Sequence, residues 1–125
     1  MKTILVDAWN TFVKNKKIDL RLLKILEKYP CDKIIVTNAN ASEQKDLGII
    51  NMPYSVFSLS HNPEKTNTLY FDILCNEKKL KKEELLYIEH NIDSFETAKI
   101  FGIKSILFKE NYLEIEEFLN QNYNE

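Results

Sequence analysis

The 125-residue sequence is poor in glycine and proline, with only 2 and 3 of them. Because the chain is also rich in Lys, Asn and Ile, the scarcity of glycine indicates a compositional bias, and single Asn or Lys residues carry little weight. The cysteines, Cys31 and Cys75, are far apart and match no metal-binding spacing, which favours a reducing, cytoplasmic setting. No apolar run approaches the roughly 20 residues of a membrane span, and the N-terminus lacks a signal-peptide pattern. We therefore expect a cytoplasmic protein without membrane association.

Neither sign of charge is in excess, since 17 Lys and Arg face 19 Asp and Glu, a net charge of −2. No overall field attracts the chain to nucleic acid or to an anionic membrane, so neither is expected as a partner. The length suits one hydrophobic core, and the sequence contains no repeat, linker or low-complexity segment. We therefore expect residues 1–125 to form a single domain.

Strand and helix patterns alternate along the chain. Short apolar runs typical of buried strands occur at 2–7, 33–37, 55–59, 85–89 and 103–108. Helical patterns lie between and after them, at about 20–29, 43–47, 66–77, 93–101 and 113–122. This alternation predicts an α/β fold, a three-layer α/β/α Rossmann-like domain with a central, mostly parallel sheet.

Several local features can also be predicted. Residues 8–17 are expected to form a loop, in which Asn10 stands where a tight turn needs a positive φ. The hydroxyl of Thr11 is expected to bond to the nearby backbone. Ser42 is a candidate N-cap for the helix that follows it, and His61, for which the sequence shows no partner, is expected in a loop.

Polar groups end three of the predicted strands. They are Asp7, then Thr37 with Asn38, then Glu89 with His90, and Lys65 lies between the last two in the sequence. Ligands of open α/β sheets bind outside the carboxyl ends of the strands. If these three ends converge, they form one polar site.

Each of these residues suits anion or metal chemistry. The Asp7 carboxylate can act as a nucleophile or hold Mg²⁺. The Thr37 hydroxyl, with the amides that follow it, is a candidate anion cradle, and Lys65 can neutralise a phosphate. Glu89 or His90 can ligate a metal or bond to a substrate, although imidazole matches Mg²⁺ poorly. Taken singly, each residue fits an ordinary turn, strand-end or surface role at least as well.

Four segments in this order resemble the motifs of the haloacid dehalogenase (HAD) superfamily of hydrolases and phosphatases. Residues 4–11, ILVDAWNT, are similar to its first motif, a strand followed by Asp-x-Asp-x-Thr. Residues 34–38, IIVTN, are similar to the second, and Lys65 to the lysine of the third. Residues 85–103 are similar to the fourth, a strand, an acidic pair and a helix ending in Ala-x-x-x-Gly. The resemblance extends from residue 4 to residue 108.

The resemblance implies a HAD-like fold and a role for each matching residue. The implied catalytic residues are Asp7 as nucleophile, Thr37 and Lys65. The implied phosphate-binding residues are Thr11, Thr37, Asn38 and Lys65. The implied metal site consists of Asp7, Trp9 through its backbone carbonyl, Glu89 and His90.

Two departures from the family pattern affect the chemistry. Trp9 replaces the second aspartate of the first motif, the general acid/base, and an indole cannot shuttle a proton at neutral pH. His90 stands at the position aligned with a Mg²⁺-binding aspartate. Mg²⁺ binding is therefore expected to be weakened or absent, with Glu89 as a substitute ligand. Phosphomonoester turnover should also fall, because general acid–base catalysis is typically worth ~10²–10⁴-fold.

The 2-haloacid dehalogenases, a metal-independent branch, resemble this chain in having an aromatic residue at position 9. Those enzymes carry a helical cap domain after the first motif. Here 29 residues separate Asp7 from Thr37 and 27 separate Thr37 from Lys65, so neither gap holds a cap of any size. A small substrate would sit in an open site unless a second copy of the chain covered it.

Three functions remain open. The first is a phosphatase-type hydrolase that acts on a phosphorylated macromolecule, alone or as a homo-oligomer. The second is a catalytically inactive protein that binds a phosphorylated ligand or a protein partner, which Trp9 favours because an indole suits stacking and protein contact. The third is a metal-independent, dehalogenase-like hydrolase, which the missing cap disfavours.

Overall fold

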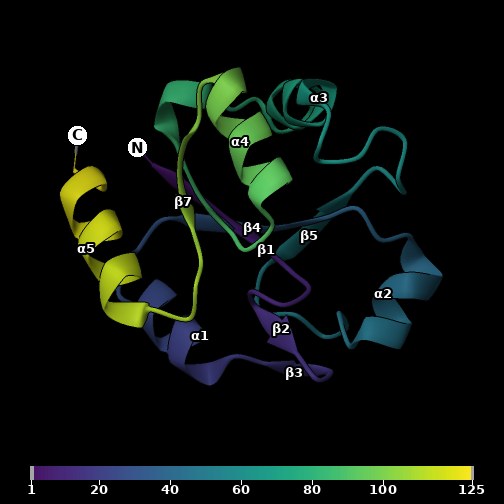
Figure 1. Ribbon diagram of the computed structural model, residues 1–125, viewed down its shortest axis with the longest axis horizontal. Coiled ribbons are helices and arrows are strands. Elements are labelled where there is room, and N and C mark those ends of the chain that lie inside the picture. The colour runs from purple at the N-terminus through teal and green to yellow at the C-terminus, as the bar shows by residue number, and fades with distance from the viewer. Residues whose placement is uncertain (1, 125) are drawn as a thin grey trace.

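The computed structural model describes residues 2–124, and five of its strands form one parallel sheet in the order β5-β4-β1-β6-β7 (Figure 1). These strands are β1 (Thr3–Asp7), β4 (Asp32–Thr37), β5 (Ser55–Ser58), β6 (Leu85–Glu89) and β7 (Lys104–Leu107). The helices are α1 (Leu20–Leu26), α2 (Ala41–Leu47), α3 (Thr68–Lys78), α4 (Ile92–Phe101) and α5 (Tyr112–Asn122), with a 3₁₀ turn η1 (Lys82–Glu84). The predicted fold class is confirmed.

Helices cover both faces of the sheet, α1 and α5 on one and α3 and α4 on the other (Figure 1). Alternate residues of β1 enter opposite cores: Val6 packs in the cluster that contains α1 and α5, and Leu5 in the cluster that contains α3 and α4. Every residue of β1 and β6 is buried. Burial on both faces explains why these strands are almost continuously apolar.

The strand order places three strand ends side by side. In the register, Asp7 of β1 faces Val36 of β4, while Val6 faces Ile88 of β6. The chain moves outward from β1 to β4 and β5 on one side, and then to β6 and β7 on the other. This reversal creates a switch point at the carboxyl end of β1, where ligands of such sheets bind.

The segment after β1 is more ordered than predicted. Within the expected loop at residues 8–17, β2 (Val13–Lys14) and β3 (Lys17–Ile18) form an antiparallel hairpin. Asn15 and Lys16 at its turn both have positive φ, as a tight two-residue hairpin turn of this kind requires. The predicted positive φ of Asn10 is confirmed, at 64°.

Helix α2 begins one residue before the predicted cap. Its N-cap is Asn40, whose side chain accepts a hydrogen bond from the Glu43 amide, while the Glu43 side chain accepts one from the Asn40 amide. This reciprocal capping box satisfies two amides at the helix start. The prediction of Ser42 was therefore wrong, because Ser42 already lies inside the helix. None of the helices within residues 2–124 is long and apolar enough to cross a membrane.

Candidate functional site

A hollow of about 340 Å³ lies at the carboxyl edge of the sheet, at the switch point. It brings together all but one of the residues predicted from the strand ends and motifs. These lining residues are Asp7, Trp9, Thr37, Asn38, Lys65, Glu89 and His90. The exception, Thr11, is fully buried and hydrogen-bonded to Asp7.

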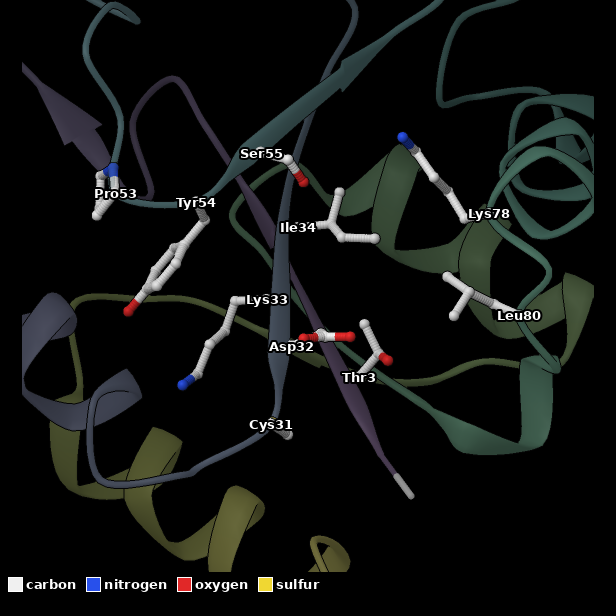
Figure 2. Close-up of a pocket in the computed structure, with 10 residues that line it drawn as sticks. All are labelled: Thr3, Cys31, Asp32, Lys33, Ile34, Pro53, Tyr54, Ser55, Lys78 and Leu80. Atoms are coloured by element: carbon white, nitrogen blue, oxygen red, sulfur yellow. The ribbon is translucent and has the colours of Figure 1, made fainter.

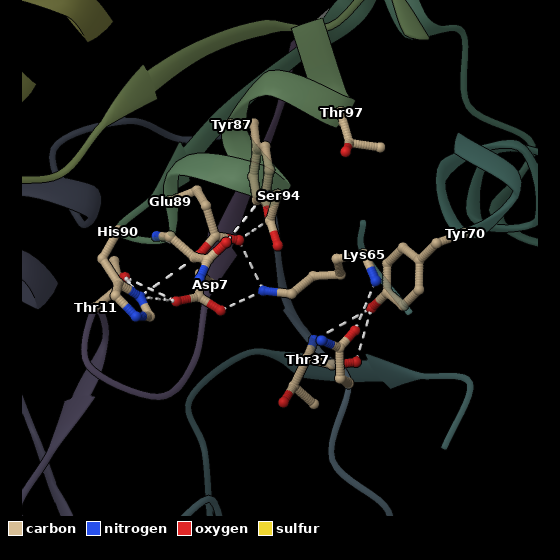
Figure 3. A network of polar contacts seen from close by, with 12 residues as sticks. Asp7, Thr11, Thr37, Lys65, Tyr70, Tyr87, Glu89, His90, Ser94 and Thr97 are labelled. Carbon is tan, nitrogen blue, oxygen red and sulfur yellow. Dashed lines mark hydrogen bonds and ion pairs between the residues drawn. The ribbon is translucent and has the colours of Figure 1, made fainter. Parts of the chain in front are cut away.

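Asp7 is at the centre of a polar network (Figure 3). The Lys65 ammonium donates a hydrogen bond to its Oδ1 atom. On the other side, the Thr11 hydroxyl donates to Oδ2 at 2.8 Å, and His90 Nδ1 lies 2.7 Å from the same oxygen. The prediction that the Thr11 hydroxyl bonds to the local backbone was wrong, because the turn directs it to the carboxylate instead.

The Lys65 ammonium also bridges to Glu89, 2.7 Å from Oε1. The Tyr87 hydroxyl donates to the same oxygen, and the Asn91 amide donates to Glu89 Oε2 at 3.1 Å. The Lys65 amide donates to the Asn38 side-chain oxygen at 2.7 Å. Asn38 thus ties the loop that carries Lys65 to the end of β4.

Burial and neighbouring charges shift the pKa values of the Asp7 and Glu89 carboxyl groups in opposite directions. Desolvation by burial raises the pKa of Asp7, but the charge of Lys65 and the hydrogen bonds from His90 and Lys65 outweigh it and hold that pKa at about 2. Desolvation and the neighbouring Asp7 charge raise the pKa of Glu89 to about 7, despite Lys65. The hydrogen bond to Asp7 raises the pKa of His90 above its ordinary value. Near neutral pH, Asp7 is therefore ionised, whereas Glu89 holds a proton much more readily than an ordinary glutamate.

Tyr70 on α3 holds the ends of β4 and β5. Its hydroxyl accepts a hydrogen bond from the Thr37 amide at 3.2 Å and lies 3.0 Å from the carbonyl oxygens of Thr37 and Phe57. The Thr37 hydroxyl accepts a bond from the Ala39 amide at 3.2 Å. Tyr70 was not predicted from the sequence, because a tyrosine on the buried face of a helix looks like any other core aromatic.

His61 lies in a loop, as predicted, and has two partners at the rim of the hollow. Its Nδ1 atom lies 2.6 Å from Glu64 and its Nε2 atom 2.6 Å from Glu43. Hydrogen bonds to both carboxylates raise the pKa of His61. This link joins the start of α2 to the loop before Lys65. Glu64 is only three residues from His61, whereas Glu43 is 18 residues away and is brought beside it by the fold.

Trp9 lies at the mouth of the hollow with 49% of its surface exposed. Its ring meets the His90 ring edge to face, with centroids 6.0 Å apart. The Trp9 side chain thus offers an apolar, aromatic surface next to the ionised groups of the hollow.

Asp7, Glu89 and His90 each offer a ligand atom, and these atoms lie within 4.8 Å of one another, so the cluster could hold a metal ion. As arranged, however, these three residues do not fit Mg²⁺. Nδ1 of His90 is engaged with Asp7, and imidazole is a poor Mg²⁺ ligand. Among the described residues, no buried side-chain nitrogen or oxygen lacks a hydrogen-bond partner.

A second hollow, of about 440 Å³, lies at the opposite, amino edge of the sheet (Figure 2). Thr3, Asp32 and Ser55, at the starts of three strands, line it. Its two lysines have partners, since Lys33 donates to a backbone carbonyl and Lys78 lies over an aromatic ring. None of the predicted site residues reaches this hollow.

Solved structures with the same fold are known, but all those described here share less than a fifth of their residues with this chain. No protein-family model matches the chain, and no curated protein matches it. An uncharacterized protein from Corynebacterium glutamicum is 17% identical over 96% of both chains, with a TM-score of 0.67. The core domain of a proposed phosphoglycolate phosphatase from Streptococcus pneumoniae is 16% identical over 93% of this chain and 95% of that one, with a TM-score of 0.60.

A third structure, an uncharacterized protein from Listeria monocytogenes, is 17% identical over 87% of this chain and 79% of that one, with a TM-score of 0.66. Likeness at such low identity concerns the fold alone. Together with the sheet order and the motifs at its carboxyl edge, it shows that the chain has a HAD-like fold.

Proposed function

We propose that this protein is a phosphatase-type hydrolase that uses Asp7 as its nucleophile. The observation that carries the proposal is the state of the Asp7 carboxylate. It is ionised, with a pKa of about 2, lies between the Lys65 and His90 side chains, and lines an open hollow. A carboxylate held in this way can form a covalent intermediate, and the flanking Lys65 ammonium and His90 ring suit an anionic substrate.

The proposed reaction has two steps. An oxygen of Asp7 attacks phosphorus, the ester P–O bond breaks, and the leaving group departs as an oxyanion. Water then attacks the aspartyl phosphate and releases orthophosphate, which restores the Asp7 carboxylate. The two protons of the water end on the leaving group and on the phosphate. Lys65 and His90 balance the charge of the phosphate oxygens throughout.

The expected substrates follow from the groups around the hollow. Because Trp9 cannot protonate a leaving group, esters with acidic leaving groups, such as aryl phosphates, should react fastest. The segment from Asp7 to Thr37 contains β2, β3, α1 and β4, and the segment from Thr37 to Lys65 contains α2 and β5. We expect neither segment to form a cap, so a phosphorylated macromolecule fits the proposal better than a small metabolite.

The exposed indole of Trp9 favours a second candidate, binding of a phosphorylated ligand or protein without turnover. An aromatic surface beside an anion site strengthens binding and contributes no proton transfer. In this case the site would hold orthophosphate and still leave phosphate esters intact.

An aryl phosphate assay tests the proposal. The wild-type protein is compared with Asp7→Asn, and with Asp72→Asn as a matched control, because Asp72 is exposed on α3. The assay is run in EDTA and again in Mg²⁺. We expect activity that is lost in Asp7→Asn and retained in Asp72→Asn. Equal rates in wild type and Asp7→Asn would reject Asp7 as the nucleophile. Orthophosphate binding without turnover would favour the second candidate.

A further inference from the structure

We infer that the His90 side chain, together with Lys65, takes the place of a divalent cation beside Asp7, so that this site binds a phosphate group without a metal ion. The inference rests on the proposed function, since it concerns the same anion site. It goes beyond that function because it assigns the place of a metal ion to side chains of the chain itself.

The position of His90 Nδ1 is the first evidence. It lies 2.7 Å from Asp7 Oδ2 and 3.5 Å from Glu89 Oε2, between the two carboxyl groups of the candidate metal cluster. The Asp7 carboxylate can only accept a hydrogen bond, so Nδ1 carries the proton. A protonated Nδ1 has no lone pair left for a metal ion.

The remaining oxygens of the cluster are the second evidence. Oδ1 of Asp7 bonds to Lys65, and Oδ2 bonds to Thr11 and His90. Glu89 Oε1 bonds to Lys65, while Oε2 accepts from the Asn91 amide. A metal ion would therefore have to displace the His90 proton and break bonds that are already made. A Mg²⁺ ion would gain little binding energy in return, since it prefers oxygen ligands to the imidazole of His90.

The donors around Asp7 are the third evidence. Lys65 and His90 flank Asp7 on opposite sides, and each places an N–H donor within hydrogen-bond distance of one of its oxygens. The same two donors can turn to the oxygens of a phosphate group that enters the hollow. The hollow that these groups line is open, with 26% of the His90 side chain exposed, so an incoming phosphate can reach the imidazole.

Calorimetric titration with orthophosphate tests the inference directly. The wild-type protein is titrated in EDTA and again in MgCl₂, and separately with MgCl₂ alone. We expect the same orthophosphate Kd in both solutions, within about twofold, and no heat from Mg²⁺ alone. Trp9 is the only tryptophan and lies against His90, so its fluorescence gives a second readout of phosphate binding.

Two variants at the same position sharpen the test. His90→Asp should bind orthophosphate at least about tenfold more weakly in EDTA and recover in MgCl₂, because a carboxylate restores an oxygen ligand. His90→Gln, which is polar and uncharged, should be weakened in both solutions.

The possible results separate the inference from the proposed function. Wild-type binding that tightens about tenfold or more in MgCl₂, or uptake of Mg²⁺ alone, would overturn the inference and leave the phosphate site standing. Absence of orthophosphate binding in either solution would overturn both. The wild-type titrations decide the matter even if a variant fails to fold.

Discussion

Lys65 is the most deeply buried positive charge of the site, and its removal tests how the two carboxyl groups are held. Only 4% of the residue is exposed, and its ammonium contacts both Asp7 and Glu89. The substitution Lys65→Met keeps most of the length and volume of the side chain and removes the charge. It leaves two carboxyl groups facing each other across a buried gap.

The size of the effect follows from the pKa values. A shift of the Asp7 pKa from 3.8 to about 2 corresponds to about 2 kcal/mol of stabilisation, at about 1.4 kcal/mol per pH unit. Because this pKa is lowered, the stabilisation is present above about pH 4 and is lost as the pH falls toward 2. Removing one partner of a buried pair typically costs about 3–5 kcal/mol. Glu89 can take up a proton, so we expect the lower end, about 3 kcal/mol near neutral pH.

Urea denaturation of four proteins near neutral pH measures this loss. They are the wild type, Lys65→Met, Glu89→Gln and the double variant. The double variant should recover about 1 kcal/mol or more relative to Lys65→Met alone, because it removes the second carboxylate. Lys45→Met, at an exposed position on α2, is the control and should change stability by at most about 0.5 kcal/mol. A loss below about 1 kcal/mol in Lys65→Met would refute the view that this lysine neutralises a buried pair.

Three further predictions concern stability. The pKa of Glu89 is raised from 4.5 to about 7, so the free energy of unfolding of the wild type should fall by about 3 kcal/mol as the pH rises through this window. Urea denaturation at a series of pH values should show this fall in the wild type and a flatter dependence in Glu89→Gln. The same pH dependence in both proteins would contradict the prediction. Tyr70→Phe should lower the free energy of unfolding by about 1–3 kcal/mol and weaken orthophosphate binding, because it leaves the amide and carbonyl groups at the strand ends without their partner. An unchanged free energy of unfolding and an unchanged Kd would argue against a positioning role for Tyr70. Gly48→Ala should lower the melting temperature more than Gly102→Ala. Both glycines have positive φ, but a Cβ at position 48 would also lie 2.5 Å from the Lys16 backbone. A larger fall in melting temperature for Gly102→Ala would be inconsistent with this packing.

Much of the fold could be predicted from the sequence. Buried parallel strands must be apolar on both faces, so β1, β4 and β6 stand out as short hydrophobic runs separated by helical patterns. Parallel strands also end at one edge, which is why Asp7, Thr37 and Glu89 could be expected to lie close together. The positive φ of Asn10 was predictable from the local sequence, because a tight turn needs a residue that tolerates positive φ, and asparagine does so better than most.

Short-range details were less predictable where several residues suit the same role. Asn40 and Ser42 are both good N-cap residues, and the choice of Asn40 depends on the path by which the chain leaves β4. The hairpin of β2 and β3 was missed because each strand has only two residues, too few to show a periodic pattern.

The partners inside the site were decided by the tertiary structure alone. Lys65 and His90 reach Asp7 across 58 and 83 positions of sequence, and no local rule joins residues that far apart. They meet because the sheet order places β6 directly beside β1, and because α3 packs so that the loop before it lies over the strand ends. The charges depend on the same assembly, since burial opposes ionisation and only the neighbouring groups determine which carboxyl stays ionised. The sequence thus determined which reactive groups stand at the strand ends, and the packing of distant segments determined their partners and their charge.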